Sequence, residues 1–218
     1  MSAREEILAR IRAALGEDPR PTPSELGSPT ALTRPTPSDL GEQARATDVV
    51  ALFADRLVDY KATVRRCAPV ELPATIDEAL AATAVVVVPE DVPGDWLSAY
   101  HREARPESPA APLSVAELDA AGVTVLTGCA VAIAETGTII LDAGPGQGRR
   151  ALTLVPDHHV CVVRADQIAA SVPAGLARLT EPTRPLTLIS GPSATSDIEL
   201  NRVEGVHGPR RLDVIIVG

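Results

Sequence analysis

Aromatic residues make up only 2% of this 218-residue chain, and lysine occurs once, at Lys61. With so few rings, the core must be built from Ala, Val, Leu and Ile. The chain also lacks the aromatic platform on which single-stranded nucleic acids stack. The formal net charge of −9 disfavours electrostatic binding to phosphate backbones. We therefore expect no nucleic acid among the partners.

Cysteine and long apolar runs are scarce as well. The three cysteines, Cys67, Cys129 and Cys161, are too far apart for a CxxC metal or redox motif. We expect each to be a small buried hydrophobic side chain in a reducing compartment. No apolar run approaches the roughly 18 residues of a membrane-spanning helix, and the N-terminus begins with charged residues rather than a signal-peptide core. These features predict a soluble, cytoplasmic protein with no membrane insertion.

Proline, by contrast, is abundant, and it is concentrated in residues 17–45. Because proline removes a backbone donor and disfavours helix before it, this stretch is predicted to be an extended linker. Ser2 and Glu5 form a capping box ahead of apolar residues at helical spacing, so residues 1–16 are predicted to be an amphipathic helix. That helix packs either on its own domain or on a partner. Residues 46–218 are predicted to be one globular α/β domain.

The remaining sequence alternates short helical patterns with continuous runs of Val, Ile and Leu. This alternation predicts a mixed, mainly parallel sheet covered by helices. The segments between 143 and 150 and between 156 and 159 are too short for a crossover helix, which predicts antiparallel neighbours there. A capping box, Ser114 with Glu117, predicts one further helix start. The expected helices are 48–61, 75–82, 96–102 and 165–179, and the expected strands are 62–67, 85–88, 123–126, 138–142, 151–155, 160–163, 186–190 and 212–217.

Glu135 stands in an apolar run within the segment Ala134–Thr138. A buried carboxylate is costly unless it is hydrogen-bonded, paired or placed at an opening. Glu135 is therefore a candidate nucleophile, general base or ligand-orienting acceptor, and Thr136, Gly137 and Thr138 offer hydroxyls and open backbone beside it. The alternative is a carboxylate that accepts backbone N–H groups and holds a turn.

The segment Ala143–Arg150 has glycines at alternate positions followed by two arginines. Such a loop could hold an anionic ligand, but it matches neither the dinucleotide fingerprint nor a phosphate-binding P-loop. We favour the other interpretation, a flexible hairpin loop.

The segment Ile189–Glu199 leaves a predicted strand, passes a Gly-Pro turn and is expected to enter a short helix. A strand, a glycine turn and a hydroxyl-rich helix start together direct backbone N–H groups toward an anion. The alternative is a helix cap with no ligand. The candidate ligand-binding residues in this segment are Gly191, Ser193, Thr195, Ser196 and Asp197.

Three segments resemble the lactate-utilisation protein C family, also called the LUD-domain family. They are Ile133–Leu141, Ile189–Glu199 and the Gly-Val-His-Gly-Pro motif over Gly205–Pro209. The resemblance implies a fold similar to that of sugar-phosphate isomerases and CoA-transferases. It also implies a role in the oxidation of L-lactate to pyruvate together with iron–sulfur partner proteins. One departure is Ala194, where many members carry a longer polar or basic residue.

Two hypotheses follow from the resemblance. In the first, the chain is a non-redox accessory or regulatory component that binds a small anionic ligand, because its scattered cysteines cannot hold a cubane cluster. In the second, it is a transferase or ligase that uses Glu135, by analogy with the glutamate of CoA-transferases. His207 is a candidate general acid or a turn histidine bonded to backbone. His158 and His159 would point to opposite strand faces, so no metal site is expected, and the cofactor stays open.

Overall fold

The computed structural model describes residue 6 and residues 48–181, 183–192, 194–195, 203–204 and 208–218. The helix expected over residues 1–16 and the linker expected over residues 17–45 lie outside the described residues, apart from Glu6, which is helical. None of the described helices has the length and apolar character that crossing a membrane would require.

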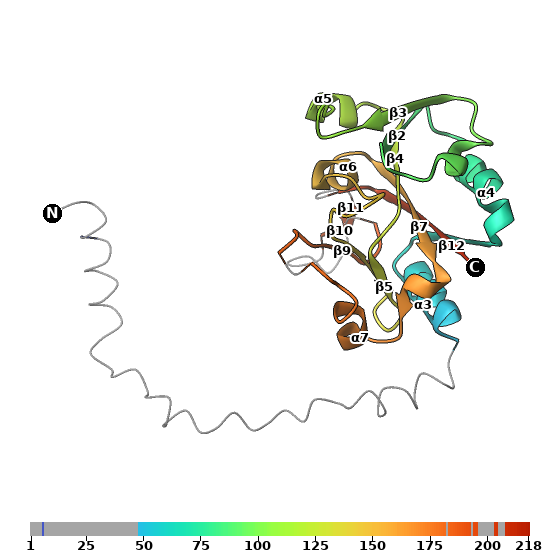
Figure 1. Ribbon diagram of the computed structural model, residues 1–218, viewed down its shortest axis with the longest axis vertical. Helices are drawn as coiled ribbons and strands as arrows, with labels where there is room; N and C mark the ends of the chain where they lie inside the picture. The colour runs from blue at the N-terminus through green and yellow to red at the C-terminus, as the bar shows by residue number, and fades with distance from the viewer. Residues whose placement is uncertain (1–5, 7–47, 182, 193, 196–202, 205–207) are drawn as a thin grey trace, which may run out of the picture. The chain divides into compact units, whose positions relative to one another are not determined.

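Six parallel strands form the main sheet (Figure 1). They are β1 (Thr63–Cys67), β2 (Val85–Pro89), β3 (Glu103–Glu107), β4 (Val123–Thr127), β7 (His158–Arg164) and β12 (Arg211–Val217). Their order is β1-β12-β7-β4-β2-β3, and every neighbouring pair is parallel. All carboxyl ends therefore lie along one edge of the sheet, and all amino ends lie along the opposite edge.

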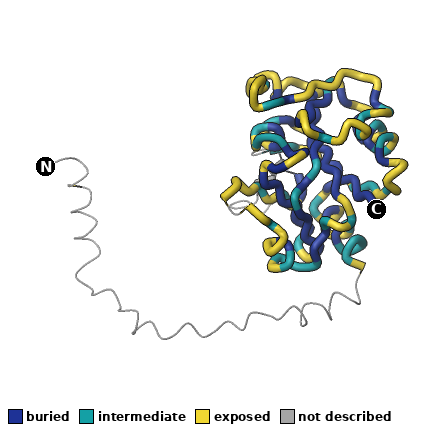
Figure 2. Tube along the Cα trace, in the orientation of Figure 1, coloured by how far each residue is buried: buried dark blue, intermediate teal, exposed yellow. Residues whose placement is uncertain are grey.

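The central strands of the main sheet, β12, β7, β4 and β2, are buried on both faces, as the valine run of β2 predicted. Val86 packs with α4 (Leu72–Ala79), whereas Val87 packs with α5 (Val115–Leu118) and α6 (Arg150–Leu154). Because successive residues of a strand point to opposite faces, helices cover both sides of β2. Figure 2 shows the same arrangement as buried segments running through the strands, with exposed segments around them.

Helix α3 (Val49–Asp59) packs on the main sheet beside a second, smaller sheet. Asp48 caps it, since its carboxylate accepts hydrogen bonds from two backbone N–H groups of the first turn, at 3.0 and 3.2 Å. Phe53 and Leu57 are fully buried in the cluster that joins this helix to both sheets. The expected helix over residues 48–61 is therefore confirmed.

The second sheet has four strands in the order β8-β5-β6-β9. They are β5 (Val131–Ile133), β6 (Thr138–Leu141), β8 (Ile168–Ala169) and β9 (Thr187–Ile189). Strand β6 is antiparallel to both of its neighbours, whereas β5 and β8 are parallel. Helix α7 (Val172–Leu176) packs on this sheet, and β10 (Ala194–Thr195) pairs antiparallel with β11 (Val203–Glu204). The fold is therefore α/β and mainly parallel: the six-stranded sheet is parallel throughout, and the antiparallel pairs lie in the smaller sheets.

The strand expected over residues 151–155 is wrong, because these residues belong to helix α6. Leu152 is buried and Val155 packs in the same cluster, whereas Leu154 is 38% exposed. Such a short apolar run does not separate helix from strand by its pattern alone. The expected antiparallel neighbours are wrong as well, since β6 and β7 belong to different sheets.

Two expected helices are shorter than predicted. Around Trp96 there is only a 3₁₀ turn, Gly94–Leu97, and residues 98–102 are not helical; strand β3 begins directly after the expected helix end. The helix expected over residues 165–179 is divided into the 3₁₀ turn Ala165–Gln167, strand β8 and helix α7. Strand β3 has no apolar pattern because it is an edge strand with mostly exposed residues, so hydrophobic periodicity does not reveal it.

Helix starts were predicted with mixed success. The Ser114–Glu117 capping box is present, with reciprocal hydrogen bonds of 2.8 and 3.3 Å. Helix α4 begins earlier than expected, after the 3₁₀ turn Pro69–Glu71, and the Thr75 hydroxyl donates to the Glu71 carbonyl instead of capping.

A row of buried polar side chains crosses the main sheet near its amino end. Arg65 on β1 donates to Asp213 on β12 at 2.5 Å, and Asp213 also lies 2.5 Å from His158 Nε2 on β7. His158 Nδ1 is 3.0 Å from the Thr124 hydroxyl on β4, which is 2.9 Å from the Thr83 hydroxyl. Burial acts to raise the pKa of Asp213, but the hydrogen bonds from His158 and Arg65 outweigh it and hold that pKa below its ordinary value.

Asp213→Ala should strongly destabilise the fold. It leaves the His158 and Arg65 donors without their carboxylate, and breaking a buried pair costs about 3–5 kcal/mol. Because the pKa of Asp213 is lower in the folded chain than in the unfolded chain, its contribution is present above about pH 4 and is lost as the pH falls through the folded value. Urea denaturation at pH 7 measures the loss, with Asp55→Ala on the exposed side of α3 as control. Equal free energies of unfolding for the two variants would contradict the expectation.

His159 should make the fold sensitive to mild acid. Its side chain is fully buried, and burial together with the nearby His158 charge lowers its pKa to about 3. Because the unfolded chain takes up this proton near pH 6.5, the free energy of unfolding should fall by roughly 1.4 kcal/mol per pH unit below that value. Denaturation of the His159→Gln variant at several pH values should show a smaller slope, whereas exposed His101→Gln should keep the original one.

Candidate functional site

Glu135 lies in the turn between β5 and β6, and its side chain is exposed. Its carboxylate accepts a hydrogen bond from the Val172 backbone N–H at 3.3 Å, at the start of α7. Its own backbone N–H donates to the Ala170 carbonyl at 3.2 Å. These contacts match the interpretation in which the carboxylate holds a turn, and they tie the β5–β6 turn to α7.

Three hydroxyl groups form a chain beside this turn. The Thr136 and Thr138 hydroxyl oxygens are 2.7 Å apart, and Thr138 lies 2.9 Å from the Ser190 hydroxyl at the end of β9. Thr138 is 7% exposed. The segment Ala134–Thr138 is therefore adjacent in space to Ser190, at the start of the segment Ile189–Glu199. We call Thr136, Thr138 and Ser190 the hydroxyl cluster.

Two glycines allow α3 to approach the hydroxyl cluster. Gly137 has φ +60°, and a Cβ atom there would lie 2.7 Å from the Arg56 Cβ. Gly191 has φ +88°, and its Cβ would lie 2.6 Å from the Tyr60 Cβ and 2.8 Å from the Tyr60 carbonyl oxygen. Any side chain at either position would force α3 away from the turns that carry the cluster.

The segment after Gly191 differs from the sequence expectation where it is described. Ala194–Thr195 form strand β10 rather than the entry to a helix, because they pair with β11. Ser193, Ser196, Asp197 and His207 lie outside the described residues. Ser190, by contrast, was not among the expected ligand-binding residues, although its hydroxyl immediately before the Gly-Pro turn was visible in the sequence.

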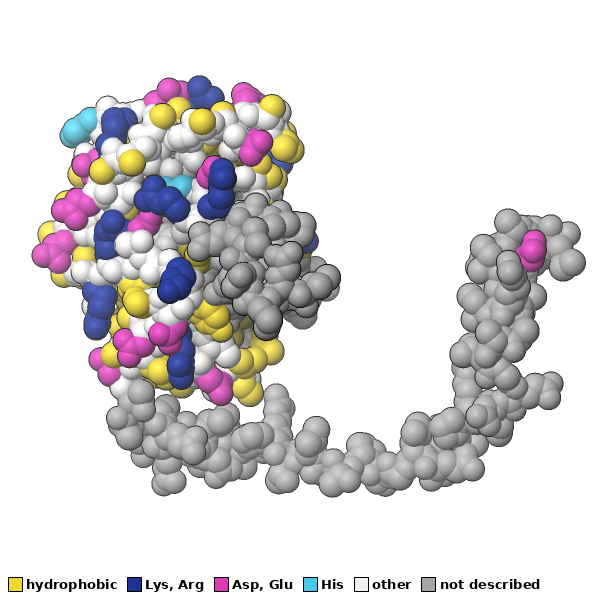
Figure 3. Space-filling model, turned by 180° about the vertical axis from the view of Figure 1, so that it is seen from behind, with side chains coloured by type: hydrophobic (Ala, Val, Ile, Leu, Met, Phe, Trp, Pro, Cys, Tyr) yellow, Lys and Arg dark blue, Asp and Glu magenta, His cyan; other side chains and the backbone are white. Residues whose placement is uncertain are grey.

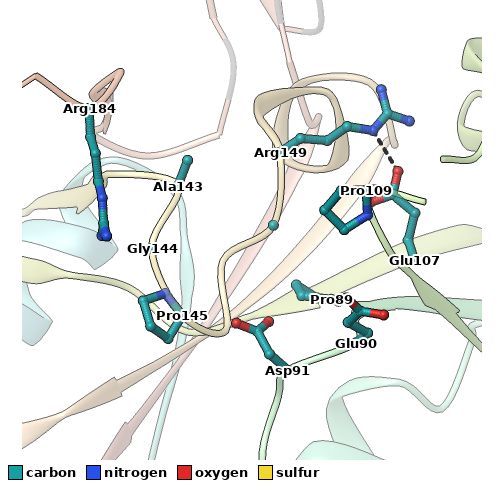
Figure 4. Close-up of a pocket in the computed structure, with 11 residues that line it drawn as sticks. Pro89, Glu90, Asp91, Glu107, Pro109, Ala143, Gly144, Pro145, Arg149 and Arg184 are labelled. Atoms are coloured by element: carbon teal, nitrogen blue, oxygen red, sulfur yellow. Dashed lines mark hydrogen bonds and ion pairs between the residues drawn. The ribbon is translucent and has the colours of Figure 1, made fainter. Parts of the chain in front are cut away.

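A hollow of about 440 Å³ lies at the carboxyl ends of β2 and β3 (Figure 4). In open α/β sheets, ligands bind in crevices at this edge. The loop from Ala143 to Arg149 forms one wall, and Arg184 lines the hollow as well. Figure 4 shows Glu90 and Asp91 between Arg184 on one side and the bonded pair Arg149–Glu107 on the other.

The loop wall is held by side chains, so the favoured interpretation as a flexible hairpin loop is wrong. Gln147 is buried and bonds twice to Asp142, through the Asp142 backbone N–H and its carboxylate, both at 2.7 Å. The Gly146 N–H donates to Asp91 at 3.0 Å, and the Gly128 N–H donates to the Gly146 carbonyl at 2.8 Å. The loop leads into helix α6 rather than into a second strand.

The other interpretation of this loop, an anion-binding cradle, has little support. Arg149 donates to the buried Glu107 carboxylate at 2.5 Å and also to the Leu113 carbonyl. The charge of this guanidinium is balanced by the Glu107 carboxylate, which weakens its attraction for an anionic ligand. On the face seen from behind in Figure 3, basic and acidic side chains are likewise intermixed.

His158 and His159 are buried in the core, whereas His101 is exposed. His158 contacts Thr124 and Asp213, whereas His159 contacts the Thr127 hydroxyl at 2.8 Å, so the two rings point to opposite faces as predicted. Cys129 and Cys161 are buried, and Cys67 is partly exposed. Within the described ranges, no group of three or more His, Cys, Asp or Glu side chains is arranged to hold a metal ion.

Gly191→Ala should disturb the packing of α3 against the segment that carries Ser190, and so destabilise the fold. A left-handed backbone costs a non-glycine residue about 1–2 kcal/mol, and the overlap with Tyr60 adds to that cost. Urea denaturation should therefore show a lower free energy of unfolding. Gly94→Ala is the matched control, because a Cβ there meets nothing within 4 Å. Equal stability of the two variants would contradict the close approach to Tyr60.

The chain is similar to known proteins over most of its length. The model of the LUD domain matches residues 51–217. A protein of Deinococcus radiodurans named lactate utilization protein C is 54% identical over 174 residues, which cover 78% of this chain and 80% of that protein. A protein of the same name from Halalkalibacterium halodurans is 35% identical over 92 residues, 39% of this chain and 40% of that protein.

A solved structure resembles the fold. It is the crystal structure of a DUF162 family protein from Deinococcus radiodurans at 1.70 Å resolution. The TM-score is 0.68 at 46% sequence identity, with 78% of this chain and 97% of that chain covered. The finer likeness to sugar-phosphate isomerases and CoA-transferases stays a prediction.

Proposed function

The chain belongs to the LUD domain family, and from this membership we propose that it serves lactate utilisation. The observation that carries the proposal is the 54% identity to a relative named lactate utilization protein C, over about four fifths of each chain. At this identity and coverage the two proteins share a fold and its buried positions. A shared role follows from that similarity more directly than from any single side chain.

Within lactate utilisation, the role is that of a non-redox accessory or regulatory component. The redox centres of an iron–sulfur system that oxidises L-lactate to pyruvate would then reside on partner proteins. Cys129 supports this assignment: its hydrogen bond with Cys161, together with burial, raises the pKa of the Cys129 thiol well above its ordinary value. Iron–sulfur clusters are held by thiolates, and a thiol kept protonated in the core is a poor ligand.

The ligand of this component is a small anion bound at the hydroxyl cluster. The Thr138 hydroxyl lies within hydrogen-bond distance of the Thr136 and Ser190 hydroxyls, and each hydroxyl can rotate to donate to a ligand oxygen. Gly137 and Gly191, both with positive φ, hold the turns that carry these hydroxyls close against α3. The site extends to Ser193, Thr195, Ser196 and Asp197, and His207 serves as its proton donor.

The contacts of Glu135 favour the accessory role over a transferase or ligase. Its carboxylate is engaged by the Val172 N–H, so it acts as the acceptor that holds a turn. An attacking carboxylate would instead need to be free to reach the substrate.

A deletion strain tests the role directly. Removal of the gene should abolish growth on L-lactate as sole carbon source and leave growth on pyruvate intact, because only the oxidation step is lost. The full-length chain should restore growth and should co-purify with cysteine-rich iron–sulfur proteins. Normal growth of the deletion strain on L-lactate would refute the proposal.

Complementation with variants tests the site. Thr138→Val removes one hydroxyl at nearly constant volume and should fail to restore growth on L-lactate, whereas Thr63→Val at an exposed position of β1 should restore it. Glu135→Gln separates the two hypotheses, since full complementation is expected for an accessory component. Loss of growth with a folded Glu135→Gln protein would favour the transferase instead. Circular dichroism of each purified variant verifies that the fold survives.

A further inference from the structure

A hollow of about 240 Å³ lies at the amino ends of β4, β7 and β12, on the edge of the main sheet opposite the hollow of Figure 4. Thr124, His158 and Arg211 line it, one from each strand. Thr124 and His158 also belong to the buried polar row, whereas Asp213 and Arg65 of that row lie behind them. We call this cavity the amino-end hollow. The polar row therefore reaches a cavity at one threonine and one histidine.

The hydrogen bonds of these two residues have a defined direction. Asp213 has a lowered pKa, so it is an ionised acceptor, and His158 Nε2 donates to it at 2.5 Å. In the neutral imidazole Nδ1 is then the acceptor, and the Thr124 hydroxyl donates to it at 3.0 Å. The Thr83 hydroxyl, 2.9 Å from the Thr124 oxygen, donates to that oxygen in turn. The proton of Thr124 is therefore directed at a basic nitrogen.

This is the arrangement of an activated nucleophile. A hydroxyl is a weak nucleophile until a neighbouring base accepts its proton, and a third group must orient that base. Thr124, His158 and Asp213 occupy these three places. Asp213 is 1% exposed, and a triad likewise keeps its acid buried behind the histidine. Such triads are recognised by geometry rather than by fold or by chain order.

Burial limits what can reach Thr124 and His158. Their side chains are almost fully buried, and both line the amino-end hollow, so a substrate meets them only through it. Pockets for drug-sized ligands measure roughly 300–1,000 Å³. The hollow, at about 240 Å³, is smaller than these, so it accommodates a short acyl group rather than a large one.

Arg211 supplies positive charge at the same hollow. Among the described residues its only polar partner is Asp213, at 3.6 Å, which is beyond hydrogen-bond distance. Its N–H groups are thus available to a carbonyl oxygen that becomes negatively charged when the carbonyl carbon is attacked. Arg210 also lines the hollow, but its guanidinium is held by the Asp157 carboxylate at 2.9 Å.

We propose that the amino-end hollow is an esterase site for small esters and thioesters of short acyl chains, with Thr124 as nucleophile. The Thr124 oxygen attacks the acyl carbon while its proton passes to His158 Nδ1. The bond to the leaving alcohol or thiol breaks, the leaving group takes that proton, and the acyl group remains as an ester on Thr124. Water then attacks this ester and gives a proton to His158. The Thr124 oxygen recovers that proton as the carboxylic acid leaves.

This activity goes beyond the accessory role in lactate utilisation. The amino-end hollow has no residue in common with the hydroxyl cluster. The esterase site and the anionic-ligand site can therefore each fail without affecting the other.

Covalent labelling tests the nucleophile without any substitution. The full-length chain should react with a fluorophosphonate ester, with loss of fluoride, and mass spectrometry of its peptides should locate the adduct at Thr124. An excess of p-nitrophenyl acetate should slow the labelling, because the ester competes for the same hydroxyl.

Two substitutions at Thr124 separate catalysis from structure. Thr124→Val removes the hydroxyl at nearly constant volume, and it should lower the rate of p-nitrophenyl acetate hydrolysis by about a hundredfold or more. Thr124→Ser keeps the hydroxyl and should retain the activity and the adduct. A row with a structural role alone would give the same rate per folded molecule in both variants. Circular dichroism measures the folded fraction.

Arg211→Gln should lower kcat for the same ester about tenfold. This loss is smaller than that from a buried oxyanion donor, because the Arg211 side chain is 60% exposed. Arg66→Gln is the matched control, since Arg66 is an exposed arginine of β1 that does not line the hollow. Equal rates in these two variants would exclude Arg211 from the site.

The proposal is wrong if the fluorophosphonate leaves Thr124 unmodified, and this result decides the matter even where Thr124→Val does not fold. It is also wrong if folded Thr124→Val hydrolyses p-nitrophenyl acetate as fast as the unaltered chain. Exposed groups such as His101 or Lys61 would then account for the hydrolysis.

Discussion

The buried row from Arg65 to Thr83 is the constraint on which the main sheet depends. Its central carboxylate, Asp213, is 1% exposed, and an ionised group so deep is tolerated only when its partners are in place. Those partners come from β1 and β7, on either side of β12. A slip of one residue in any of these strands would turn the polar side chain to the other face and leave the carboxylate unpaired. The row therefore specifies register as well as contributing stability.

The polar row sets the strand register near the amino ends of the main sheet. The loops at the opposite, carboxyl edge take no part in it. The loop after β2 and the loop after β6 meet there through the Asp91–Gly146 hydrogen bond, although the two residues are far apart in sequence. Residues of both loops line the 440 Å³ hollow. The hydroxyl cluster belongs instead to the second sheet, where β6 pairs with β9. The hollow and the hydroxyl cluster thus belong to different sheets.

The predicted helices and strands were confirmed where their residues are continuously buried. They were wrong where the residues are exposed or where the apolar pattern fits both a helix and a strand. The strand expected over residues 123–126 lies within β4, because every residue of β4 is buried and the sequence there is continuously apolar. The edge strand β3 had no such signal, since it is mostly exposed. At Ala151–Val155 the apolar run fitted a helix as well as a strand, and packing against β2 and β4 decided for the helix. Thr136, Thr138 and Gly191 were predicted from the sequence as candidate ligand-binding residues. Ser190 was not, because it was predicted as the last residue of the strand over residues 186–190.

By itself, the sequence determined the α/β class, the family motifs and the scarcity of aromatic and thiol chemistry, because these depend on composition and local pattern. Only the tertiary structure decided that Thr138 meets Ser190, and that Glu135 accepts a hydrogen bond from the start of α7. It alone revealed that Arg149, Arg164 and Arg184 are paired with carboxylates. The reason is physical: these properties depend on contacts between residues distant in the chain. Such contacts are set by sheet order and strand register, which no local pattern encodes.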